Sequence, residues 1–167
     1  MTEEEAIRKL SYGADFSTSE FNDFRNNRNV VAYAWKRDSN AIKFANDEVH
    51  NDIDFMSSAV LHGADVMPYA PAVLRSDREF VLEAIKHQDN AVRYAGYNLK
   101  SDRDFILDAI KISDSSLKFA SDELRNDEDF LYQLVKIEDY AFLGASPEIR
   151  AKFKRVDDFV EYYEAKK

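Results

Sequence analysis

The chain of 167 residues has no cysteine, and it has only four glycines and three prolines. Without cysteine, disulfides, thiol nucleophiles and cysteine-ligated zinc or iron–sulfur sites are excluded. The scarcity of glycine and proline argues against flexible linkers, so we expect one ordered domain. Glycine-rich phosphate loops, GxSxG and HExxH are missing as well. We therefore predict no catalytic, cofactor-binding or metal-binding residue, and no enzyme.

Basic residues are outnumbered, because 23 Lys and Arg stand against 32 Asp and Glu, for a formal charge of −9. This charge opposes direct binding to nucleic acid and to anionic lipid. No apolar run approaches the ~18 residues of a transmembrane helix. The acidic start, Met-Thr-Glu-Glu-Glu-Ala, is unlike a signal peptide. We expect a cytoplasmic protein that binds neither nucleic acid nor membrane.

What the sequence does contain is an internal repeat of 25 residues. One apolar column consists of Val30, Phe55, Phe80, Phe105 and Phe130. Four positions later stand Ala34, Ala59, Ala84, Ala109 and Leu134, and further on a column of alanines, Ala45, Ala70, Ala95, Ala120 and Ala145. An offset of four residues places side chains on one stripe of a helix. The periodicity indicates that every repeat buries the same helical faces.

Polar residues that favour helix ends recur in the same register. We predict N-caps of the first helix at Asn26, Asn51, Ser76, Ser101 and Asn126. A second helix start is predicted at Ser39, Asp89, Asp114 and Asp139, and a break or restart at Asn46, Pro71, Gly96, Ser121 and Ser146. Each repeat therefore reads as a helix of about ten residues, a short second helix and a helical turn.

Helices this short are marginal alone and must stack on their neighbours. The predicted fold is all-α, a short helical-repeat solenoid with 25-residue repeats, in a single domain spanning 1–167. Residues 1–25 are expected to form an N-terminal cap, residues 26–152 five repeats, and residues 153–167 a C-terminal capping helix. Pro68 and Pro71 predict that the repeat at 54–76 departs most from the pattern.

The segments DREFVLEAIK at 77–86 and LKFASDELRND at 117–127 resemble the repeat of a family known as a domain of unknown function, number 4116. The resemblance is clear over residues 77–127 and looser over 27–76 and 128–150. It implies a helical repeat, found in bacterial, viral and protist proteins, that has no assigned activity. It supports the fold and adds no catalytic residue.

Two sets of residues are candidates for contact with a partner. The first is a basic column with one member per repeat: Arg25, His50, Arg75, Lys100, Arg125 and Arg150. Stacking would turn the column into a track for an anionic partner, although cations at helix ends are also expected for purely structural reasons. The second set comprises tyrosines, which are favoured at interfaces: Tyr97, Tyr132, Tyr140, Tyr162 and Tyr163.

Three functional hypotheses follow from these features. The first is a non-enzymatic protein-interaction module whose curved repeat surface binds another protein. The second is a small acidic inhibitor or nucleic-acid-mimicking decoy that blocks a nucleic-acid-binding enzyme, which would require one continuous negative surface. The third and weakest is an enzyme that uses carboxylates in a groove, which would require a convergent polar pocket.

Overall fold

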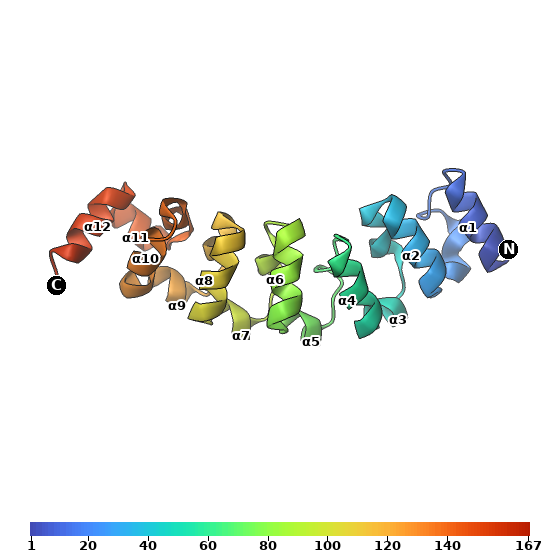
Figure 1. The fold of residues 1–167 in the computed structure, drawn as a ribbon, viewed down its shortest axis with the longest axis horizontal. Coiled ribbons are helices and arrows are strands. Elements are labelled where there is room, and N and C mark those ends of the chain that lie inside the picture. The colour runs from blue at the N-terminus through green and yellow to red at the C-terminus, as the bar shows by residue number, and fades with distance from the viewer. The chain divides into compact units, whose positions relative to one another are not determined.

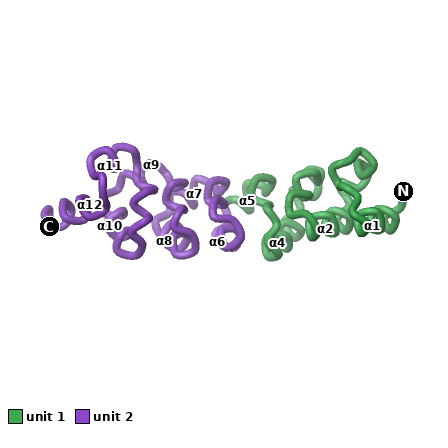
Figure 2. Tube along the Cα trace, turned by 90° about the horizontal axis from the view of Figure 1, so that it is seen from above, with its two compact units in different colours: residues 1–75 green, residues 76–167 purple.

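The computed structural model describes all residues from 1 to 167 and contains helices but no strand (Figure 1). The predicted all-helical repeat is confirmed. Packing divides the chain into two compact units, residues 1–75 and 76–167 (Figure 2), and each is described by itself below. None of the helices has the length and apolar character needed to cross a membrane. The prediction of a single domain stays a prediction.

The first compact unit begins with α1 (Glu3–Ser11) and the 3₁₀ helix η1 (Ser19–Phe24). A complete repeat follows, made of α2 (Arg28–Arg37), the 3₁₀ helix η2 (Ser39–Phe44) and α3 (Asp47–His50). The next repeat has α4 (Ile53–Leu61) and α5 (Ala72–Arg75), with no helix over 62–71. The departure predicted from Pro68 and Pro71 is therefore confirmed.

The second compact unit contains three regular repeats and a final helix. The long helices are α6 (Arg78–His87), α8 (Arg103–Ile112) and α10 (Glu128–Val135). Each is followed by a 3₁₀ helix, namely η3 (Ala91–Tyr94), η4 (Asp114–Phe119) and η5 (Asp139–Gly144). The short helices are α7 (Tyr97–Lys100), α9 (Asp122–Asn126) and α11 (Pro147–Lys152), and α12 (Val156–Glu164) ends the unit.

The long helices α6 and α8 lie side by side, and the short helices α7 and α9 lie at one end of the long ones (Figure 1). The predicted second helix of each regular repeat is thus a 3₁₀ helix of four to six residues. A 3₁₀ helix closes its hydrogen bonds over three residues, so it suits so short a segment.

The first-helix N-caps lie one residue later than predicted. They are Asn27, Asp52, Asp77, Asp102 and Asp127. The Asp77 carboxylate, for example, accepts a hydrogen bond of 2.8 Å from the Phe80 backbone N–H. Three of the four predicted second helix starts are confirmed, because η2, η4 and η5 begin at Ser39, Asp114 and Asp139. The remaining helix, η3, begins at Ala91, two residues after the predicted Asp89. The predicted restarts at Ser121 and Ser146 are confirmed, since both side chains cap short helices.

The core consists of the columns that the repeat predicts. Phe105, Phe130, Ala109 and Leu134 are fully buried, and every member of the alanine column is at most 9% exposed. The small alanine side chains allow short helices to approach closely, as stacking requires. A further aromatic column is only half-buried, and it consists of Phe44, Tyr69, Tyr94 and Phe119.

Neighbouring repeats are also joined by a recurring arginine contact. Arg28 lies 2.9 Å from the N-cap carboxylate Asp52 of the next repeat, and its guanidinium stands over the Phe55 ring at 5.7 Å. In the second compact unit Arg103 contacts Asp127 and Phe130 in the same way. Arg78 also stands over the Phe105 ring, but it lies 4.0 Å from the N-cap carboxylate Asp102 and 2.7 Å from Asp108 of the same repeat. We call Arg28, Arg78 and Arg103 the arginine ladder.

The last helix of the second compact unit is α12, and its role as a cap stays a prediction. Its Phe159 is fully buried, with ring centroids 5.6 Å from Phe142 and 5.4 Å from Phe153. At the position of the arginine ladder this last repeat has Glu128, which pairs with Lys152 at 3.3 Å and with Lys166 at 2.7 Å. The sign of the charge is reversed where the repeats stop.

Candidate functional site

Five of the six members of the basic column donate a side-chain hydrogen bond to a main-chain carbonyl. Within the first compact unit, Arg25 bonds Ser17 at 3.2 Å, and the His50 Nε2 atom lies 2.9 Å from the Ile42 carbonyl. Within the second, the bonds run from Lys100 to Arg93, from Arg125 to Gly144 and from Arg150 to Ala145. Cations that neutralise carbonyls at helix ends stabilise the fold. Arg75 is half-buried at the end of α5.

The main chain of the same column joins successive repeats. The carbonyl oxygens of Arg25, Lys100 and Arg125 accept hydrogen bonds of 2.8–2.9 Å from Asn46, Ser121 and Ser146. These three donors are the N-caps of the next short helices. The column therefore has a structural role, and its contact with a partner stays a prediction.

The tyrosines fall into exposed and packed groups. Tyr97 and Tyr140 are 67% and 66% exposed, whereas Tyr163 is buried. Tyr132 is half-buried and stacks on Tyr163 with ring centroids 4.3 Å apart. Its hydroxyl donates to Glu164 at 2.7 Å, and this bond to a carboxylate raises the pKa of Tyr132. Tyr97 and Tyr140 are thus the tyrosines best placed to contact a partner.

Tyr140 stands beside a second exposed apolar side chain, Leu143, which is also 66% exposed. The two belong to η5 and line a groove of about 210 Å³ together with Asp114, Ser115 and Lys118 of η4 and with Gly144. In the other repeats with a helical second segment, the equivalent positions hold the polar pairs Asn40 and Lys43, Asn90 and Arg93, and Ser115 and Lys118. We call Tyr140 and Leu143 the apolar pair.

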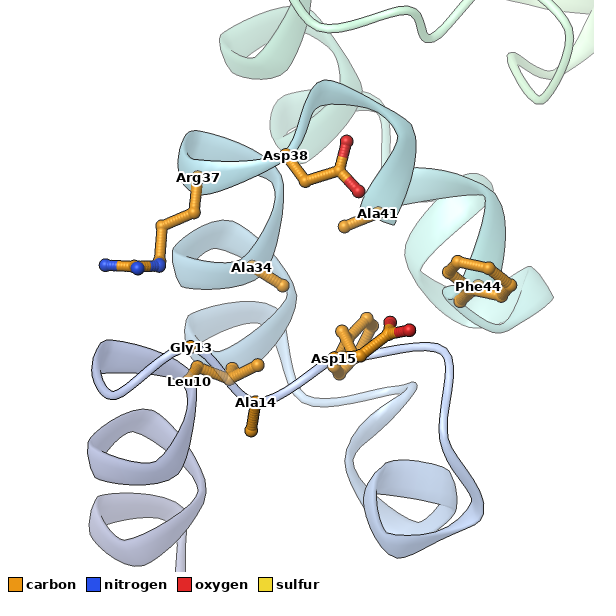
Figure 3. Close-up of a pocket in the computed structure, with 10 residues that line it drawn as sticks. Leu10, Gly13, Ala14, Asp15, Ala34, Arg37, Asp38, Ala41 and Phe44 are labelled. Carbon is orange, nitrogen blue, oxygen red and sulfur yellow. The ribbon is translucent and has the colours of Figure 1, made fainter.

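A second hollow, the N-terminal pocket, lies within the first compact unit between α1, α2, η2 and the loop at 12–18 (Figure 3). Its volume is about 280 Å³. Apolar side chains form most of the lining: Leu10, Ala14, Phe16, Ala34, Ala41 and Phe44. The polar part consists of Asp15, Arg37 and Asp38. The pocket combines an apolar floor with charged groups at its edge.

The two carboxylates of this pocket hold local main-chain turns. Asp15 accepts a hydrogen bond of 2.8 Å from the Ser17 N–H, and this bond lowers the pKa of Asp15. Asp38 caps η2 by accepting from the Asn40 N–H at 2.9 Å. Neither carboxylate forms a salt bridge, so both keep their charge toward solvent.

Sequence reasoning missed the N-terminal pocket and the arginine ladder. The turn beside the pocket contains Gly13, a lining residue that adopts a φ of +94°. A positive φ marks a turn that ends a helix, here α1. Elsewhere, no cluster of three or more His, Asp or Glu residues is arranged to hold a metal ion.

Comparison with known proteins gives a family but no characterised relative. A profile of the family described as a domain of unknown function (DUF4116) matches residues 52–100, 77–124 and 102–150. No curated protein and no solved structure matches the chain. The three matches together span 52–150, more than half of the sequence, and their starts are 25 residues apart, as the repeat is. The chain therefore belongs to the DUF4116 family.

Proposed function

We propose that this protein is a non-enzymatic interaction module that binds another protein through the apolar pair on η5. The observation that supports this function is the exposure of Tyr140 and Leu143, at 66% each, where other repeats have polar side chains. Exposed aromatic and aliphatic side chains beside a groove are typical anchors of protein interfaces. The setting we propose for this function is the cytoplasm.

The groove beside the apolar pair suits a side chain from a partner. Its Lys118 forms no salt bridge and stands 4.8 Å from the centre of the Phe119 ring, which leaves its charge at the rim. Gly144 brings η5 close to η4, so the walls of the groove are firmly held. Rigid walls reduce the entropy cost of binding.

The repeat supplies a conservative test of this function. In Tyr140→Ser/Leu143→Lys, both positions receive the residues that the preceding repeat has there, Ser115 and Lys118. The fold should therefore be retained, which circular dichroism would verify. The immobilised protein and this variant are exposed to a lysate of the source organism, and captured proteins are identified by mass spectrometry.

We expect a partner that is captured by the wild type and whose affinity falls at least ~10-fold in the double variant, as for the loss of an interface anchor. Leu61→Lys is the matched control, since Leu61 is a 62% exposed leucine of the other compact unit that does not line the N-terminal pocket. Capture that is equal for the wild type and the double variant would reject the apolar pair as the binding surface.

The alternative of a nucleic-acid-mimicking decoy receives less support. Acidic side chains are interleaved with cations, as in the pairs Arg28–Asp52, Arg78–Asp108 and Lys152–Glu128. A decoy needs a continuous negative surface to imitate a phosphate backbone. Displacement of DNA from a nucleic-acid-binding enzyme by the purified protein would revive this hypothesis.

A further inference from the structure

We propose that the N-terminal pocket binds a lysine or arginine side chain of a partner protein. This inference rests on the proposed function, because it assumes that the ligand belongs to a partner protein. It concerns a different surface from the apolar pair. The pocket lies wholly within residues 1–75, whereas the apolar pair lies within residues 76–167. Shape and charge each supply an argument.

The floor of the pocket suits an aliphatic stem. Leu10, Phe16, Ala34 and Ala41 line the floor and are only 3–4% exposed, so packing holds their positions. The small side chains of Ala34 and Ala41, which point toward one another in Figure 3, leave space that larger residues would fill. Lysine and arginine carry several methylene groups that pack on apolar surface while the charged head stays near water.

The edge of the pocket suits the cationic head. Asp15 and Asp38 approach the opening from two different segments, the loop at 12–18 and the start of η2 (Figure 3). Their charges are not neutralised by a salt bridge, and Lys43 acts on Asp15 only at longer range. A cation placed between two carboxylates gains attraction from both, whereas an anion is repelled by both.

Arg37 is the one cation of the lining, and its position does not oppose this ligand. In Figure 3 its side chain extends to the side of the pocket away from Phe44 and Asp15. It forms no salt bridge, so its guanidinium donors are free to bond main-chain carbonyls of the partner segment. The occupant we infer is therefore an extended peptide segment that inserts one basic side chain.

The proposal is tested on the full chain with small probes of defined chemistry. Amide signals of the ¹⁵N-labelled protein are followed during titration with Nα-acetyl-lysine N-methylamide and with the arginine equivalent. Two neutral control probes contain norleucine in place of lysine and citrulline in place of arginine. We expect at least one basic probe to shift the amide signals of Gly13, Ala14 and Ala41, and the neutral probes to shift them much less.

Two variants separate a charge effect from damage to the fold. Asp15→Asn/Asp38→Asn keeps the oxygen atoms that hold the turns, because asparagine caps as well as aspartate does. We expect it to weaken the binding of the basic probe about fivefold, as for the loss of two exposed ion pairs. Asp23→Asn, at an exposed acid of η1, should change nothing.

The proposal is overturned if neither basic probe shifts these signals, if the neutral probes shift them equally, or if Asp15→Asn/Asp38→Asn binds as the wild type does. These outcomes are independent of the proposed function, because the probes replace the natural partner. The variant Tyr140→Ser/Leu143→Lys should bind the probes normally, so a failure of the apolar pair would leave this result intact.

Discussion

At Gly144 the main chain of η5 lies close to η4. A Cβ atom at this position would lie 2.7 Å from the Cβ of Leu117 and 2.8 Å from the backbone nitrogen of Lys118. We expect Gly144→Ala to lower the free energy of unfolding by about 1–3 kcal/mol, because a buried contact must open. Urea denaturation followed by circular dichroism measures this change.

Gly96 provides the control for that substitution. It is the N-cap of α7, and the equivalent residues Ser121 and Ser146 cap their helices with their hydroxyl groups. Gly96→Ser should therefore leave stability unchanged or raise it by a few tenths of a kcal/mol. If Gly144→Ala is as well tolerated as Gly96→Ser, the contact between η4 and η5 is not as tight as described.

Asp127 is a residue with two partners. Its carboxylate accepts from the Phe130 N–H at 2.9 Å and also from the Arg103 guanidinium. Asp127→Ala should lower the free energy of unfolding by roughly 1–2 kcal/mol, mainly through loss of the cap. Asp127→Asn keeps the capping oxygen and should lose clearly less, in the same denaturation experiment. Equal losses would show that charge, and not capping, dominates.

The sequence predicts the core residues well and the N-caps one residue early. Core positions follow from the periodicity, since Phe105 and Phe130 lie 25 residues apart. A shift of one residue would place a different side chain in the column, so the position of each core residue is unambiguous. At the caps, pairs such as Ser76 and Asp77 place two good capping residues side by side. Only the main-chain conformation decides between them, and Asp77 has the extended conformation of an N-cap.

At the scale of elements, the 3₁₀ character of the second helices was not predicted. In a segment of only six residues, the apolar positions expected for an α-helix and for a 3₁₀ helix are the same, so the sequence pattern does not distinguish the two. The absence of a helix at 62–71 was foreseeable, because Pro68 lacks the N–H that a helix requires. The arginine ladder escaped prediction because its partners lie 24 residues apart and belong to different repeats.

Helix α12 owes part of its attachment to the charge of Glu128. The hydrogen bond from Lys166, followed by that from Lys152, lowers the pKa of Glu128 below its ordinary value of 4.5. A lowered carboxyl pKa means that the folded protein prefers the ionised form of Glu128. The pairing therefore stabilises the fold fully when the pH is above the ordinary pKa of the carboxyl group. The stabilisation is lost as the pH falls through the lower pKa of the folded protein.

We therefore expect Glu128→Gln to be less stable than the wild type by about 1 kcal/mol or less at neutral pH, the range of partly exposed ion pairs. The difference should shrink as the pH is lowered below 4.5 and vanish in strong acid. Urea denaturation at several pH values measures it. Glu161→Gln, at an exposed residue of α12, serves as the control. A difference that does not change with pH would contradict the role of the charge.

At the scale of the whole molecule, the repeat register passes through residues 75 and 76 without a change of spacing, from Phe55 to Phe80. We expect the chain to unfold in one transition, with a calorimetric enthalpy equal to the van't Hoff enthalpy. Differential scanning calorimetry of the full chain tests this. Two resolved transitions would instead assign separate stabilities to residues 1–75 and 76–167.

The N-terminal pocket illustrates what a single sequence does not reveal. Its lining comes from α1, the loop at 12–18, α2 and η2, and none of these segments alone has a binding signature. The pocket arises from the packing of these segments on one another. The apolar pair, by contrast, can be found from sequence by comparing Tyr140 and Leu143 with their equivalents in other repeats.

The arginine ladder gives each regular junction a direction, because the guanidinium comes from one repeat and the carboxylate from the next. A repeat that carries both groups offers matching halves to its two neighbours. Duplicating such a repeat would leave every arginine with a carboxylate partner. Replacing the arginine or the carboxylate alone would leave the other without its partner. Duplication or loss of a whole repeat should therefore disturb the fold less than a change at a single junction does.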